Sequence, residues 1–191
     1  MNTRLVASIV AAASLVFTAC GSSGESTSTQ DSVATPAASD FNDADVMFAQ
    51  MMIPHHEQAI EMADIALDPT VGASAEIVAL ATQIKAAQDP EIAQMTDLLA
   101  SWGKSTMPDD GMDHSSMMSG MLSADELDSL ATMRGPDFDK AWAAAMIAHH
   151  EGAISMANDV LKDGSNSAIL DLANAIVATQ QTEIDQLKTL L

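Results

Sequence analysis

The chain has 191 residues, with 27 acidic against 7 basic side chains and a formal net charge of −20. Such a surface repels nucleic acid and anionic lipid and attracts cations, so nucleic acid is excluded as a partner. Its single cysteine excludes an internal disulfide.

Residues 1–20 have the pattern of a lipoprotein signal. Arg4 precedes an apolar run, from Leu5 to Phe17, that is too short to span a bilayer stably. Small residues flank Cys20, which we expect to carry a lipid that anchors the protein to the outer face of the cell membrane. An ordinary secretory signal with an incidental cysteine is the alternative. Both predict export.

Residues 21–40 are rich in Ser and Thr and show no apolar periodicity. This composition predicts a disordered tether between the anchor and the folded part. The remaining residues, 41–191, have a length that suits one compact domain.

The first helix of this domain is predicted over residues 42–67. A kink or a freed carbonyl is expected at Pro54, because proline removes a backbone donor. The second is predicted from about residue 74 to residue 102, on an apolar stripe of helical period. Pro90 lies inside it and predicts a bend.

Residues 103–136 connect the two halves of the domain. Ser123 and Glu126 form a capping-box pattern that opens a short extra helix, and Gly135-Pro136 is expected to end it. The third main helix is predicted from about Asp137 to Lys162, and the fourth over residues 167–191. No stretch alternates like an amphipathic strand, so the domain is predicted to be an all-α four-helix bundle.

Two twelve-residue segments, beginning at Met52 and Met146, match one another. The first reads MIPHHEQAIEMA and the second MIAHHEGAISMA. The match continues after a two-residue deletion, in positions that include Gln88 with Gln180 and Glu91 with Glu183. We therefore predict two related helical hairpins, over residues 41–102 and 137–191, that close one core together.

The two histidine doublets are the main candidates for chemistry. At about 100° per residue, one face of each helix carries a doublet with two methionines, and this face must turn to the core. The predicted ligands there are His55, His56, His149, His150, Met52, Met62, Met146 and Met156. Metal coordination explains paired buried imidazoles, but a metal-free hydrogen-bond network of His, Gln and Glu is the alternative.

The partner helices offer polar side chains at matching positions. Glu91 and Glu183 are predicted either to bind the metal directly or, with Gln88 and Gln180, to orient the imidazoles. Glu57 is predicted to point away from the histidine face.

The connection between the halves is the second chemical feature. Residues 107–121 hold five methionines and the remaining histidine, and the predicted ligands are Met112, His114, Met117, Met118 and Met121. Thioethers with imidazole favour copper, especially Cu(I), where thiolates are absent. A flexible low-complexity linker is the alternative.

The doubled Met-x-x-His-His-Glu-x-Ala-Ile-x-Met-Ala pattern, with its Gln-x-x-Glu-Ile segments and lipoprotein signal, resembles the bacterial DUF305 family. The resemblance covers about residues 41–191. It implies a ferritin-like four-helix bundle, exported or membrane-tethered, in a family with some members linked to copper binding and no established enzymatic activity. On the family's motif, the four doublet histidines are the central polar residues, flanked by methionines.

These features predict a copper-binding envelope lipoprotein that sequesters or buffers metal ions, and no catalysis is required. A ferritin-like di-metal oxidase is one alternative, although it calls for a Glu-x-x-His motif that this sequence lacks. A helical adaptor whose polar core is only structural is another.

Overall fold

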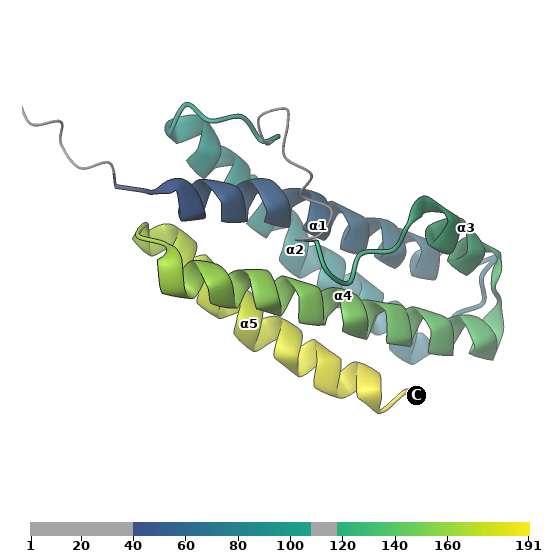
Figure 1. Cartoon of the computed structure of the whole chain (residues 1–191). Helices are drawn as coiled ribbons and strands as arrows, with labels where there is room; N and C mark the ends of the chain where they lie inside the picture. Colours follow the sequence, from purple (N-terminus) through teal and green to yellow (C-terminus); the bar gives the residue numbers. More distant parts are fainter. Residues whose placement is uncertain (1–39, 108–117) are drawn as a thin grey trace, which may run out of the picture. The chain divides into compact units, whose positions relative to one another are not determined.

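The computed structural model describes residues 40–107 and 118–191, which are helical and contain no strand (Figure 1). The helices are α1 (Asp43–Leu67), α2 (Ala75–Ser101), α3 (Ala124–Thr132), α4 (Gly135–Asp163) and α5 (Ser167–Lys188). The all-α prediction is confirmed. Within these two described ranges, no helix is long and apolar enough to cross a membrane.

Capping side chains set the predicted helix starts. Asn42 caps α1 by accepting from the backbone of Ala44 and Asp45, and the Asp45 carboxylate accepts from the Asn42 N–H in return. Ser123 and Glu126 form the predicted capping box at the start of α3. These local hydrogen bonds satisfy donors that a helix leaves free at its first turn.

Some helix ends differ from the prediction by one to three residues. α4 begins at Gly135, two residues before the expected Asp137, because Pro136 fits the first turn of a helix, where its missing N–H costs nothing. α5 ends at Lys188 and not at the last residue. α1 and α2 continue through Pro54 and Pro90 as helix.

The four long helices form a bundle of two hairpins. α1 packs along α2 and α4 packs along α5, while α1 also contacts α4 and α2 contacts α5 (Figure 1). The short α3 lies against α4. A ferritin-like four-helix bundle is therefore the fold, as predicted. Descent of the two hairpins from one repeated unit stays a prediction.

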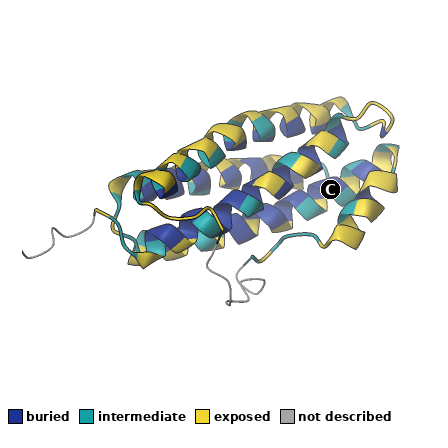
Figure 2. Ribbon diagram, turned by 90° about the horizontal axis from the view of Figure 1, so that it is seen from above, coloured by how far each residue is buried: buried dark blue, intermediate teal, exposed yellow. Residues whose placement is uncertain are grey.

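Buried residues run along the inner face of every long helix (Figure 2) and form two apolar clusters. The α3-side cluster includes Met62, Ile77, Ile84, Phe138, Trp142, Met146, Ile184 and Leu187. The N-terminal-side cluster includes Val46, Phe48, Met52, Met95, Leu99, Val160, Ile169 and Ile176.

Between the two clusters, each long helix contributes buried polar side chains. We call this set the polar layer, and its members are His55, His56, Gln88, His149, His150, Gln180 and Glu183. Burial of polar groups is costly without partners, so the layer is the section of the core whose contacts need an explanation.

Candidate metal centre

The two histidine doublets meet inside the bundle. All four imidazoles are fully buried, with His55 and His56 on α1 and His149 and His150 on α4. The ring centroids of His55 and His149 are 3.8 Å apart, and the ring planes are inclined by 42°. The structure thus brings residues 94 positions apart in the sequence into direct contact.

A carboxylate holds one histidine of each doublet. His56 Nε2 lies 2.8 Å from Glu91 Oε2, and His150 Nε2 lies 2.8 Å from Glu183 Oε2. An ionised carboxylate only accepts hydrogen bonds, so the form of each ring that fits this contact carries the hydrogen on Nε2. In a neutral ring of that form the lone pair lies on Nδ1. Both Nδ1 atoms are buried and have no hydrogen-bond partner.

The other histidine of each doublet has weaker support. His55 Nε2 lies 3.3 Å from the backbone oxygen of Ser119, whereas its Nδ1 has no partner. His149 has no partner at either nitrogen. The four imidazoles therefore present five buried nitrogens without a hydrogen-bond partner, an arrangement that folded proteins rarely keep without a function.

Burial keeps the imidazoles of His55 and His149, which we call the central pair, uncharged. It lowers the pKa of His55 from 6.5 to about 4, against an opposing effect of the Ser119 carbonyl. Burial, with the charge of His55 as the next cause, also lowers the pKa of His149 well below 6.5. Both rings are neutral at neutral pH, and a neutral imidazole has the lone pair that a metal ion requires.

The two glutamines of the polar layer add further unsatisfied atoms. The side-chain nitrogen and oxygen of Gln88 have no partner, and neither does the side-chain oxygen of Gln180. Each lies about one helical turn before the glutamate that holds a histidine. They can therefore supply carbonyl oxygens to the same interior.

The predicted methionine ligands do not all lie in the same part of the structure. Met52, Met62 and Met146 are fully buried, but Met52 lies in the N-terminal-side cluster and the other two in the α3-side cluster. Met156 is only half-buried, because it lines a cavity at the surface between α1 and α4.

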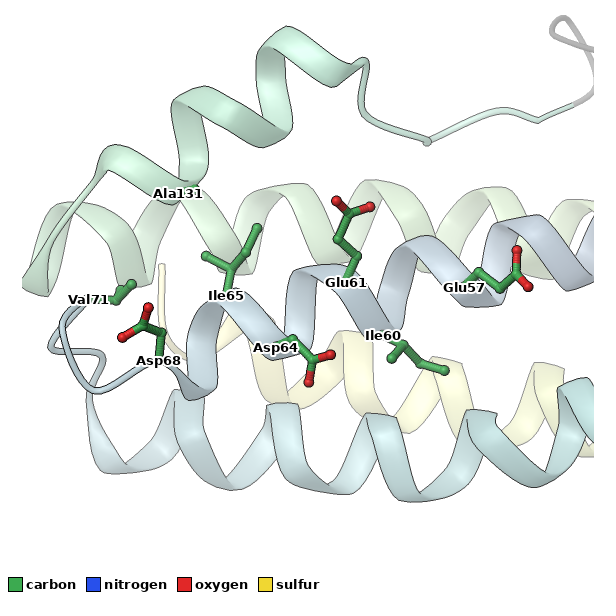
Figure 3. Close-up of a pocket in the computed structure, with 8 residues that line it drawn as sticks. All are labelled: Glu57, Ile60, Glu61, Asp64, Ile65, Asp68, Val71 and Ala131. Atoms are coloured by element: carbon green, nitrogen blue, oxygen red, sulfur yellow. The ribbon is translucent and has the colours of Figure 1, made fainter.

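The carboxylates next to the doublets face solvent. Glu57 and Glu151 are exposed, and Figure 3 shows Glu57 and Glu61 on the outer side of α1 beside a shallow acidic groove. The predicted direction of Glu57 agrees with this placement.

The end of the connection forms a strap across the centre, which the sequence analysis missed. We call residues 119–122 the strap. Gln58 donates to the Leu122 carbonyl at 2.8 Å and accepts from the Leu122 N–H at 2.7 Å. On α4, a Cβ added to Gly152 would lie 1.8 Å from the Ser119 oxygen. The strap thus crosses from α4 to α1 beside His55.

A signal for the strap was present in the doubled motif. The residue after the His-His-Glu triplet is Gln58 in the first copy and Gly152 in the second. Gln58 binds the strap and Gly152 leaves room for it, so this difference between the copies marks where the strap crosses.

Comparison with known proteins decides the family. Residues 45–191 match the family model described as Domain of unknown function (DUF305). The chain belongs to the DUF305 family. No match appears among proteins of curated function.

Solved structures of similar proteins, two of them described as DUF305 proteins, share the fold of this chain. A DUF305 fragment from Deinococcus radiodurans is 30% identical with a TM-score of 0.68, covering 78% of this chain and 95% of its own. A DUF305 protein from Streptomyces coelicolor, described as secreted, is 29% identical with a TM-score of 0.72, covering 78% and 91%. CopM in its Cu(II)-bound form is 33% identical with a TM-score of 0.64, covering 76% and 93%.

The predicted lipid-attachment site and part of the predicted ligand set cannot be placed in this DUF305 chain. Cys20, Met112, His114 and Met117 lie outside the described residues. Met118 and Met121 are described, and both are half-buried where the connection returns to the bundle.

Residues 40–107 and 118–191 contain no preformed group of three or more His, Cys, Asp or Glu side chains that could hold a metal ion. The central imidazole pair alone would therefore be an incomplete coordination sphere. Completing it calls for further donors, such as thioethers, or for rotation of neighbouring rings.

Proposed function

We propose that this protein is an exported copper-binding protein that sequesters or buffers copper ions, with the four imidazoles of the polar layer as its main ligands. The observation that carries the proposal is the set of five buried imidazole nitrogens without a partner. Each of these nitrogens either offers a lone pair or carries a hydrogen that is not donated. A buried group left unpaired in this way costs about 1–3 kcal/mol.

The donor types fit copper. Imidazole suits copper, zinc, iron and nickel, and thioethers within the same interior favour Cu(I). Solved structures of CopM include Cu(I)-bound, Cu(II)-bound and Ag-bound forms, and these relatives are 32–33% identical to this chain. Their ions support copper as the metal.

The glutamates and the central histidines have different roles in this proposal. Glu91 and Glu183 hold His56 and His150 so that Nδ1 faces the interior as the ligand atom. The low pKa values of His55 and His149 mean that metal binding displaces no proton from these rings at neutral pH.

The remaining proposals concern the segments outside the bundle. Met112, His114, Met117, Met118 and Met121 capture Cu(I) at the surface, and a lipid on Cys20 anchors the protein to the outer face of the membrane. The signal pattern of residues 1–20 and the DUF305 relative described as secreted support export. No catalysis is required.

A structural polar core is the second candidate function, since the two His–Glu hydrogen bonds alone would fit a helical adaptor. It does not account for His149, whose nitrogens have no partner. Metal analysis of untagged protein separates the candidates, because copper, iron or no metal would indicate sequestration, a di-metal oxidase or an adaptor.

Replacement of His55 and His149 together by alanine tests the proposal. We expect Cu(I) affinity to fall more than tenfold in competition with a chelator, because the paired imidazoles are lost. The matched control is Glu57→Gln with Glu151→Gln, which changes exposed neighbours and should leave affinity unchanged. Equal losses in both variants, with folding verified by circular dichroism, would refute the imidazole site.

A further inference from the structure

Three methionines line one cavity between α1 and α4. Met47 and Met51 lie one turn apart on α1, and Met156 faces the same cavity from α4. The cavity has a volume of about 490 Å³. Met47 and Met51 belong to neither histidine doublet, and the doubled motif does not include them.

The three methionines differ in how far they are exposed to solvent. Met47 is 37% exposed, Met156 is half-buried and Met51 is 4% exposed. Packing alone does not call for methionine at these three positions, because leucine fills similar volume with fewer rotatable bonds. Methionine adds a polarisable sulfur, which is a ligand for soft monovalent cations.

The charge around the cavity favours a cation. Asp159 and Asp163 also line it. An ion pair joins Lys162 to Asp159 at 3.1 Å, and both side chains are 69% exposed, so solvent screens it. Hard cations need more oxygen ligands than this, whereas Cu(I) and Ag(I) are satisfied by a few thioethers.

The cavity ends beside the imidazoles. Ser119 of the strap lines the cavity, and its carbonyl oxygen lies 3.3 Å from His55 Nε2. Ser119 therefore borders both the cavity and the buried histidine pair. Transfer of an ion from thioethers to imidazoles exchanges ligands and leaves its oxidation state unchanged.

We propose that Met47, Met51 and Met156 form a second metal site, for Cu(I) or Ag(I), from which the ion passes beneath the strap to the imidazoles. The receiving imidazoles rest on the proposed function above. The thioether site itself rests only on the cavity and its lining.

Silver titration of the full chain, with ¹³C-labelled methionine methyl groups and ¹⁵N-labelled histidines, tests the proposal. Ag(I) replaces Cu(I) as the probe because it does not change oxidation state. We expect the methyl signals of Met47, Met51 and Met156 to shift before the imidazole signals do. In the variant Met47→Leu, Met51→Leu, Met156→Leu, loading of the imidazoles should slow at least tenfold with unchanged final affinity.

The matched control is Met133→Leu, which removes a half-buried thioether that does not line this cavity. It should load at the rate of the unaltered protein. Methyl signals that stay fixed while the imidazoles load, or wild-type loading of the triple variant, would overturn the thioether site and leave the proposed function standing. Methyl shifts without any imidazole shift would support the thioether site and refute the imidazole site.

Discussion

His149 and His150 are neighbours on α4, yet their imidazoles have opposite hydrogen-bonding environments. Glu183 holds His150 at 2.8 Å, whereas both nitrogens of His149 are buried without a partner. An apolar residue in place of His149 would avoid this cost. Its presence beside His55 therefore indicates a role in binding more than in stability.

Acid is expected to destabilise the fold through the central pair. The folded-state pKa of His55 is about 4, below the 6.5 of an unperturbed histidine, so the unfolded chain binds more protons between these values. Stability is thus fully present above pH 6.5 and falls as pH drops towards 4, by about 3 kcal/mol for this group. The direction for His149 is the same.

Urea unfolding at steps between pH 7 and 4 measures this dependence. The variant His55→Leu with His149→Leu provides the control, because it lacks the two imidazoles whose pKa values are lowered by burial. Its stability should change less across the same interval. An equal slope in both proteins would contradict a neutral buried pair.

Glu183→Gln is expected to weaken copper binding by roughly tenfold or more, because the neutral amide no longer fixes the Nε2–H form of His150. Competition titration gives the affinity, and ¹⁵N NMR of His150 gives the ring form. Glu151→Gln is the matched control at an exposed position on α4. Unchanged affinity with an unchanged ring form would mean that Glu183 does not position the ligand.

Local patterns predicted the helices well. The capping side chains Asn42 and Ser123 act within three residues of where they stand, and the apolar period fixes which face turns inward. The same geometry placed the four doublet histidines in the interior and Glu57 outside.

The strap could not be predicted in this way. Its contacts join Ser119 to His55 and Leu122 to Gln58 across 64 residues, and they use backbone groups of the strap. The difference between Gln58 and Gly152 marks the place of crossing, but it does not tell which segment crosses there. Likewise, the helical periodicity predicted only which face of α4 carries Met156. It carried no information about the surface cavity that α1 forms with α4 there.

Gly152→Ala is expected to destabilise the bundle by about 1–3 kcal/mol, since the new Cβ would meet the Ser119 oxygen at 1.8 Å. Alanine for glycine inside a helix ordinarily stabilises by about 0.5–1 kcal/mol, so the sign of the change is informative. Thermal unfolding measures it, with Asn158→Ala as an exposed control on α4. A more stable Gly152→Ala protein would mean that the strap is not held against α4.

Neither hairpin holds a complete core. The α3-side cluster takes Ile184 and Leu187 from α5, and the N-terminal-side cluster takes Ile169 and Ile176 from the same helix. Both clusters also draw on α1, α2 and α4. Each is therefore closed only when all four long helices are present, which predicts one cooperative unfolding transition.

A chain that ends at Gly164 should consequently fail to fold, although it keeps three of the four long helices. We expect rapid digestion by protease and no cooperative thermal transition. A chain that begins at Asp40 is the control, because it retains both clusters. Resistance of the shortened chain to protease would show that one cluster closes without α5.

The ribosome makes α5 after the other four helices, so neither cluster can close before α5 has emerged. An early-folding N-terminal unit, common in larger chains, is absent from this bundle because α1 and α2 have no finished core between them. The growing chain stays open until α5 emerges. For the export that we propose, as an extended chain, this delay removes the need to unfold the bundle before it crosses the membrane.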